Sequence, residues 1–179
     1  MPQKFFLLFC FSLLALYACD PDNPLNPDPG NSLPPLTMEG KNTFGCLVNG
    51  EVWNAYVEQD VFGAQKINAQ YEILPDWEAF GISATKNIES ENIYQVFILD
   101  IFYPKVGENS IVFDTRVFTD FGNCGDYHLD TLSTHTMTIT KLDNIDFIVS
   151  GTFEFTVVNH DCPDTLRITD GRFDVYAKP

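Results

Sequence analysis

The clearest pattern in the chain is an alternation of apolar and polar residues over residues 145–157. Its odd positions hold Ile, Phe, Val, Gly, Phe, Phe and Val, whereas most of its even positions are polar. A period of two residues is typical of a strand with one face in a core. At about 3.3 Å per residue the stretch would span roughly 43 Å, so we expect it to bend, and Gly151 is the natural place.

The C-terminal segment alternates in the same way but changes phase. Apolar residues occupy even positions up to Ile168 and odd positions from Phe173 onwards. A β-bulge at Asp170-Gly171, with the glycine in the left-handed conformation, would account for the change and would cover Gly151 with the ring of Phe173. A tight hairpin at the same dipeptide is the alternative.

Shorter alternating segments predict further strands. They cover residues 42–48, 51–57, 65–74, 79–86, 94–103 and 110–113. Asn49-Gly50 favours a type I′ hairpin because both positions need a positive φ. About nine or ten antiparallel strands without a helix predict an all-β domain over residues 41–179. We expect a two-sheet β-sandwich, with a closed, calycin-like β-barrel as the alternative.

The first residues indicate export and lipid anchoring. Lys4 precedes a 13-residue apolar run, and Leu16-Tyr17-Ala18-Cys19 resembles a bacterial lipobox. We therefore expect residues 1–18 to be a lipoprotein signal peptide and Cys19 to carry a diacylglycerol and further acyl chains such as palmitate. Two or more acyl chains anchor a protein stably in a membrane.

Residues 19–40 are expected to form a tether. They hold six of the eleven prolines of the chain, and proline-rich segments stay extended, so about 20 residues reach roughly 60 Å. The acidic residues after Cys19 resemble the export signals of Bacteroidota surface lipoproteins. The predicted location is the outer membrane, at the cell surface or on the periplasmic face.

The charge restricts the partners. The chain has 25 acidic and 10 basic side chains and a formal net charge of −15. Such a chain repels phosphate backbones and anionic lipid headgroups. We therefore expect no nucleic acid partner, and membrane contact only through the lipid anchor.

Three cysteines remain in the predicted domain. An oxidising compartment favours one disulfide, for which we expect Cys124 and Cys162, with Cys46 as a buried thiol. The alternative is a zinc site made by Cys124, His128, His160 and Cys162. The spacing matches no familiar zinc pattern, so we predict no metal and no cofactor.

Four side chains are candidates for ligand contact. Trp77 lies in a predicted loop beside acids, which is a frequent arrangement for stacking on a sugar ring, and Tyr103 and Tyr127 lie near strand ends. Asp100 falls on the same strand face as apolar residues, where a carboxylate is at an edge, paired or functional.

Other polar residues are expected to be solvated. Thr134, Thr136, Thr138 and Thr140 form one strand face that is either a flat hydroxyl surface for a sugar or simply the solvent side of a sheet. Glu154 and Asp174 alternate outward and are expected to face water. No nucleophile elbow or phosphate loop occurs, so no catalytic residue is assigned.

The two ends of the predicted domain resemble a known family. The opening Asn42-Thr43-Phe44-Gly45-Cys46 through Trp53, and the closing segments 150–155 and 168–174, resemble a family of uncharacterised Bacteroidota lipoproteins. The resemblance implies an envelope lipoprotein with a β domain and transfers no catalytic residue.

Three functions are compatible with these observations. The favoured one is a non-catalytic, lipid-anchored module that binds a glycan, a protein or an envelope surface through loops between strands. The second is a barrel that carries a small apolar ligand among its aromatic side chains. The third is a hydrolase that uses surface carboxylates, among them Asp100.

Overall fold

The computed structural model describes residues 32–58, 65–110, 115–119 and 125–179. The predicted signal peptide, the lipid-carrying Cys19 and most of the tether lie outside these ranges. So do Cys124 and all but the first residue of the strand expected at 110–113. In the described part of the chain, no helix has the length and apolar character needed to cross a membrane.

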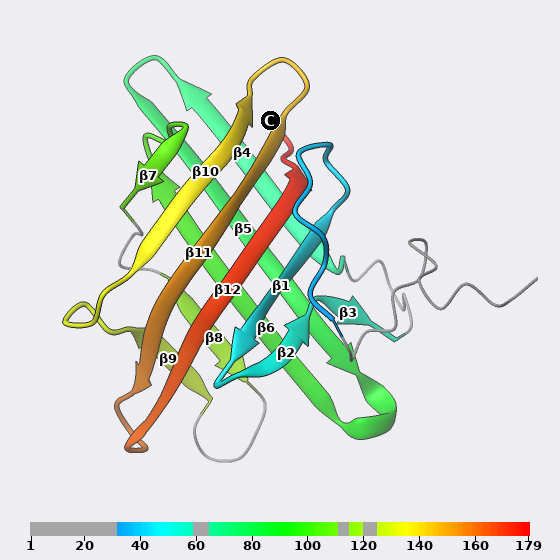
Figure 1. Ribbon diagram of the computed structural model, residues 1–179, viewed down its shortest axis with the longest axis vertical. Coiled ribbons are helices and arrows are strands. Elements are labelled where there is room, and N and C mark those ends of the chain that lie inside the picture. The colour runs from blue at the N-terminus through cyan, green and yellow to red at the C-terminus, as the bar shows by residue number, and fades with distance from the viewer. Residues whose placement is uncertain (1–31, 59–64, 111–114, 120–124) are drawn as a thin grey trace, which may run out of the picture.

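The regular secondary structure of the described residues is almost entirely β, which confirms the all-β class (Figure 1). One 3-10 turn, η1 (Glu89–Glu91), joins two of them. The strands are β1 (Thr43–Val48), β2 (Glu51–Asn54), β3 (Tyr56–Val57), β4 (Ile67–Leu74), β5 (Trp77–Ile88), β6 (Ile93–Phe102), β7 (Gly107–Asn109), β8 (Arg116–Thr119), β9 (Asp126–Leu129), β10 (Thr136–Asp143), β11 (Ile148–Asn159) and β12 (Asp164–Tyr176).

The strands do not form the two separate sheets of the expected sandwich. Eleven of those described belong to one sheet, in the order β2-β1-β12-β11-β9-β8-β6-β5-β3, with β10 on β11 and β4 on β5. Along one edge, β11 pairs with both β10 and β9, and β5 pairs in the same way with both β4 and β3. The sheet curls over on itself (Figure 1). The pairing is mixed, because β3 runs parallel to β5.

The end of the chain brings the curled sheet close to a closed barrel. Just beyond β12, the backbone of Lys178 accepts a hydrogen bond from Tyr71 N at 2.8 Å and donates one to Ala69 O at 2.9 Å, both on β4. A layer of β10, β11, β12 and β1 therefore faces a layer of β4, β5, β6 and β8 (Figure 1). The architecture is closer to the barrel alternative.

Aromatic side chains from both layers meet in the interior. The Phe44 ring lies 5.0 Å from Phe153 and 5.8 Å from Phe97, and Trp53 lies 4.4 Å from Phe97, measured between ring centroids. Each such pair contributes about 0.5–1.5 kcal/mol beyond the burial of its area. These rings contact one another across the barrel and join its two layers.

The predicted Asn49-Gly50 hairpin is confirmed. Asn49 has φ +52° and Gly50 has φ +88°, as a type I′ turn requires. The turn sets a register in which Cys46 pairs with Trp53. Both side chains point inward, and Cys46 is the fully buried thiol that the sequence predicts.

The predicted β-bulge between β11 and β12 is also confirmed, with one correction. Phe173 pairs with Gly151, and its Cζ atom would lie 2.9 Å from a Cβ added there, so the ring does cover the glycine. The left-handed residue is Asp170 (φ +52°) and not Gly171. Gly171 is needed for space instead, because an added Cβ would overlap the ring of Phe153.

The prediction that Asp174 is solvated is wrong, whereas Glu154 is exposed as expected. Asp174 is 1% exposed, although its side chain points to the outer side of β12. A strap formed by residues 32–41 covers it there. Its carboxylate accepts five hydrogen bonds, from Thr37 Oγ1 (2.6 Å), Ser150 Oγ (2.7 Å) and the backbone N–H groups of Gly40 (2.8 Å), Glu39 (3.1 Å) and Lys41 (3.2 Å).

The strap continues along the outer side of β1. Pro34 lies against Gly45, where an added Cβ would be 2.6 Å from the proline Cδ. The backbone oxygen of Ser32 accepts a hydrogen bond of 2.8 Å from Asn54 Nδ2. Residues 32–40, which the sequence assigns to the tether, are therefore part of the folded structure.

Removing the charge of Asp174 should weaken the attachment of the strap. Burial alone would raise the pKa of this carboxyl, but its hydrogen bonds favour the ionised form more strongly and hold the pKa below its ordinary value. Asp174→Asn should lower the free energy of unfolding in urea by about 2–3 kcal/mol at pH 7. Exposed Glu154→Gln, the control, should change it by less than about 0.5 kcal/mol.

The same carboxylate predicts an acid-dependent loss of stability. Because the folded-state pKa is depressed, its contribution is complete above the pKa of the unfolded chain and is lost as the pH falls below about 4. In Asp174→Asn the unfolding free energy should therefore fall less steeply below this pH than in the wild type. Equal slopes would contradict the role assigned to Asp174.

Gly171 should tolerate no side chain. Gly171→Ala places a Cβ against the Phe153 ring and 2.5 Å from the Phe153 carbonyl oxygen, and such overpacking costs about 1–3 kcal/mol. Gly125→Ala is a matched control, because its nearest heavy atom would be 3.6 Å away. Similar unfolding free energies for the two variants would disprove the packing argument.

Candidate functional site

A groove of about 240 Å³ lies on the outer side of β4, β5 and β6. We call it the aromatic groove. Because side chains alternate along a strand, the residues of each strand that face the groove are two positions apart. It is lined by Gln70, Glu72, Trp77, Ala79, Gly81, Asp100 and Phe102.

The groove exists because its central strand carries small residues. On β5, Ala79 stands between Glu72 and Phe102, and Gly81 stands between Gln70 and Asp100. A Cβ added to Gly81 would lie 2.7 Å from Asp100 Oδ1. The Asp100 carboxylate therefore lies over Gly81, and the floor is lowest at Ala79, with larger side chains on both flanks.

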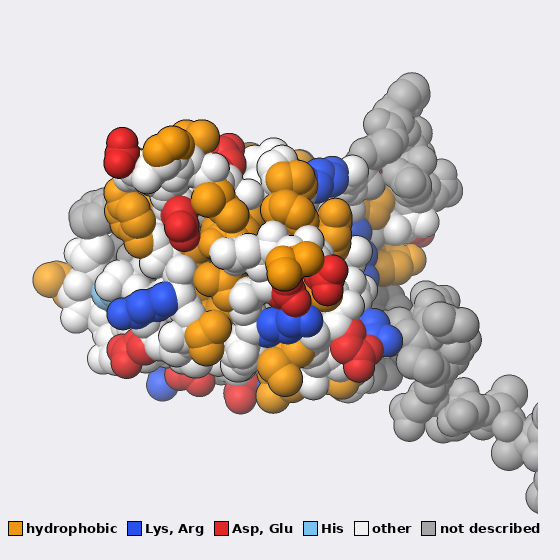
Figure 2. Space-filling view, turned by 90° about the horizontal axis from the view of Figure 1, so that it is seen from above, with side chains coloured by type: hydrophobic (Ala, Val, Ile, Leu, Met, Phe, Trp, Pro, Cys, Tyr) orange, Lys and Arg blue, Asp and Glu red, His pale blue; other side chains and the backbone are white. Residues whose placement is uncertain are grey.

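Two aromatic rings form one end of the groove. Trp77 is half-buried and Phe102 is 49% exposed, with their ring centroids 6.0 Å apart and the planes inclined at 50°. Ile73 and Leu74, the last residues of β4, are also exposed. Figure 2, seen from this end of the molecule, shows hydrophobic side chains interspersed with acidic ones.

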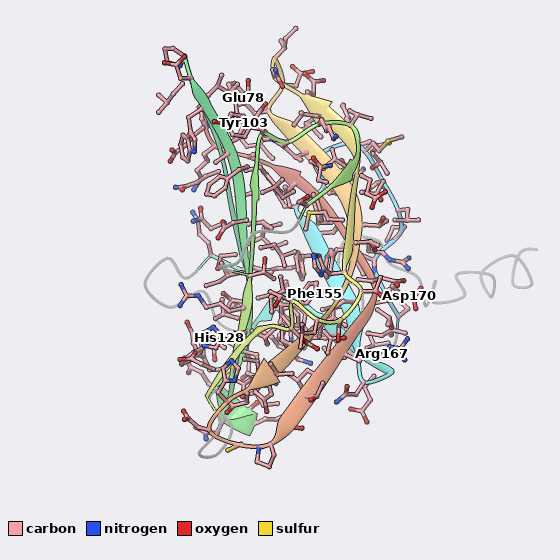
Figure 3. All side chains as sticks on the ribbon, turned by 90° about the vertical axis from the view of Figure 1, so that its left-hand side faces the viewer. Glu78, Tyr103, His128, Phe155, Arg167 and Asp170 are labelled. Carbon is pink, nitrogen blue, oxygen red and sulfur yellow. The ribbon has the colours of Figure 1, made fainter. Side chains whose placement is uncertain are left out.

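Tyr103 stands beside this end. Its backbone N–H donates to Glu78 O at 2.9 Å, and its hydroxyl donates to Asp76 O at 3.1 Å. The side chain is 61% exposed. Figure 3 shows Tyr103 next to Glu78 at the upper end of the molecule.

The structure thus brings together three of the four predicted ligand-binding residues. Trp77 and Asp100 line one groove, and Tyr103 lies at its end, although Trp77 begins a strand instead of lying in a loop. Asp100 is half-buried on the outer face of β6, where it has a partner in the protein. Gln70, Glu72 and Phe102 were not predicted, and the alternation of residues 67–74 is the pattern that could have indicated the first two.

Tyr127 belongs to a different region. It is 5% exposed on β9, and its hydroxyl donates a hydrogen bond of 2.6 Å to Asp164 Oδ2. Burial, together with the adjacent carboxylate, raises the pKa of Tyr127 to about 12. The residue joins β9 to the start of β12 and does not contact the aromatic groove.

The histidine and cysteine residues of the alternative zinc site are only partly assembled. His128 and His160 lie with their rings 6.1 Å apart and inclined by 20°. Cys162 is disulfide-bonded, and Cys124 lies outside the described residues, so the pairing of these two remains a prediction. Within the described ranges, no three His, Cys, Asp or Glu side chains are grouped as a metal site requires.

The Tyr127–Asp164 contact predicts a shift in an acidic titration. The tyrosine O–H stabilises the ionised carboxylate and so lowers the pKa of Asp164. Tyr127→Phe should raise that pKa towards its ordinary value, as measured by the pH dependence of the Asp164 ¹³Cγ shift. Asp143, whose pKa is lowered by the N–H groups of Asp146 and Ile145, should titrate unchanged and serves as the control.

Comparisons with known proteins give no relative from which a function can be transferred. No protein-family model, no curated protein and no solved structure matches the chain. Its function must therefore be inferred from its own residues and geometry.

Proposed function

We propose that the protein is a lipid-anchored lipoprotein of the cell envelope whose β-domain binds a glycan in the aromatic groove without catalysis. The anchoring part rests on the lipobox at residues 16–19 and the proline-rich segment after it. The acidic residues after Cys19, and the resemblance to Bacteroidota lipoproteins, favour the outer membrane and its outer surface.

The chemistry of the groove is the observation that carries the proposal. A sugar ring has an apolar C–H face and a rim of hydroxyl groups. The Trp77 and Phe102 rings offer a surface for the C–H face, and the small side chain of Ala79 keeps the floor low beside them. Gln70, Glu72 and Asp100 supply acceptors, and Gln70 also supplies an amide donor, for the hydroxyl groups.

The place of the groove on the domain supports this function. The strap, which leads to the predicted anchor, covers the layer that contains β1 and β12. The aromatic groove lies on the opposite layer, formed by β4, β5 and β6 (Figure 1). A tether that reaches one side of the barrel leaves the other side accessible to a polymer.

Two features favour surface binding over the other candidate functions. The interior rings of Phe44, Trp53 and Phe97 contact one another, which leaves the outer surface as the better place for a ligand. Glu72 and Asp100 share the groove, but a hydrolase would in addition need one of them to act as an acid and the other as a base or nucleophile. We propose no such division of roles.

The two tryptophans allow a direct test. Trp53 is buried in the core and Trp77 lines the groove, so a bound sugar should change the fluorescence of Trp77 alone. The full-length protein in detergent is titrated with neutral and acidic oligosaccharides. Trp77→Ala removes the reporter, so its affinity is measured by isothermal titration calorimetry. It should bind about tenfold more weakly, because the lost ring contact is worth about 1.5 kcal/mol.

Matched variants make the result specific. Trp53→Phe should retain the fluorescence change, and Tyr127→Phe, which lies outside the groove, should retain the affinity. Binding that survives Trp77→Ala undiminished would contradict the aromatic groove as the site. Release of reducing ends from the bound sugar, abolished in Asp100→Asn, would replace the binding function with a hydrolytic one.

A further inference from the structure

A second outer hollow lies on the opposite layer of the barrel, over β10, β11 and β12. Two adjoining depressions of about 430 and 280 Å³ share Thr136 and Glu154 in their lining. Figure 3 shows Arg167 and Asp170 on the outer side of this layer. We call the hollow the threonine groove after six of its lining residues: Thr134, Thr136, Thr152, Thr156, Thr165 and Thr169.

The bulge between β11 and β12 shapes this groove. Phe153 pairs with Gly171, but Phe155 pairs with Ile168. Two residues of β12 therefore lie opposite the single residue Glu154 of β11. The rings of Phe153 and Phe155 point into the core and are at most 2% exposed. The outer surface at this point therefore carries short side chains and no aromatic ring.

The threonine hydroxyls are available for a ligand. Each hydroxyl is both a donor and an acceptor. In the described part of the chain, none of the six makes a hydrogen bond through its side chain, and all six are exposed or half-buried. In the absence of a ligand, water hydrogen-bonds to these hydroxyls. The hydroxyl groups of a ligand could take the place of those water molecules, one for each.

The charges of the groove select for an uncharged ligand. Glu154 and Arg167 are both exposed there and carry opposite charges. In the adjoining depression, the opposite charges of Asp170 and Arg172 also cancel. The groove is thus locally neutral in a chain of net charge −15. A charged ligand would be repelled by one member of each pair, whereas sugar hydroxyls can donate to Glu154 and accept from Arg167.

We infer that the threonine groove is a second saccharide site, which binds an uncharged polysaccharide strand through hydroxyl hydrogen bonds without ring stacking. It lies on the layer opposite the aromatic groove, and neither site depends on the other. With both occupied, one domain would hold two glycan strands on its two outer faces.

The test uses isotope-labelled threonine methyl groups of the full-length protein in detergent micelles. Maltohexaose, cellohexaose and laminarihexaose are the uncharged probes, and hexasaccharides of hyaluronan and chitosan are the charged ones. At least one uncharged probe should shift the methyl resonances of Thr136 and Thr156. The double variant Thr136→Val/Thr156→Val keeps both methyl positions and the β-branched shape, and should bind that probe at least fivefold more weakly.

Two control variants separate this site from the aromatic groove. Thr140→Val removes an exposed hydroxyl from the same strand outside the groove, and Trp77→Ala removes the ring of the other site; both should leave the methyl shifts and affinity unchanged. The inference is overturned if none of the three uncharged probes shifts these resonances, if a charged probe binds there more tightly, or if the double valine variant binds as the wild type does. Loss of these shifts in Trp77→Ala would also overturn it, because all binding would then belong to the aromatic groove.

Discussion

The carboxylate of Asp174 is the constraint on which the outer face of the β1–β12 layer depends. A charge can be buried there only because hydroxyl and amide groups from the strap and from β11 surround it. Three of its donors are consecutive backbone N–H groups, so the carboxylate fixes the path of the strap and not only one side chain. The segment that comes from the predicted anchor is thereby attached to the centre of the sheet and not to its edge.

The bulge in β12 is the second constraint, and it acts on both faces of the sheet. Inside, it brings Phe173 over Gly151 and places Gly171 under the ring of Phe153. Outside, it opens the surface around Glu154, where the threonine groove forms. A single additional residue thus produces both the packing of the core and the hollow on the surface.

Local features of the fold were predictable, whereas its closure was not. The alternation of residues 148–157, the Asn-Gly turn and the change of phase before Phe173 each act between neighbouring strands, and the structure confirms them. The expected start of this strand at Ile145 is wrong, because residues 144–147 form the turn between β10 and β11 and Ile145 is 87% exposed. Closure depends on contacts between distant segments, such as Lys178 with β4, and alternation carries no information about them. The burial of Asp174 was missed for the same reason, because its alternation indicates an outward side chain and says nothing of a strap that covers it.

Of the candidate site, Trp77, Tyr103 and Asp100 were found from residue type, but Glu72 and Gln70 join them only through the register of β4 on β5.

The two outer faces of the barrel differ in chemical character because their outward residues are of different types. On β5 the outward residues at the centre of the groove are alanine and glycine, so the rings of the flanking residues become accessible. On β10, β11 and β12 the outward residues are largely threonines, which keep the backbone extended through their branched Cβ and present a hydroxyl to water. The first surface therefore exposes aromatic rings, and the second exposes mainly hydroxyl groups. The strap occupies part of the hydroxyl face and none of the aromatic groove's lining: Leu36 borders the threonine groove, whereas the aromatic groove lies on the opposite layer.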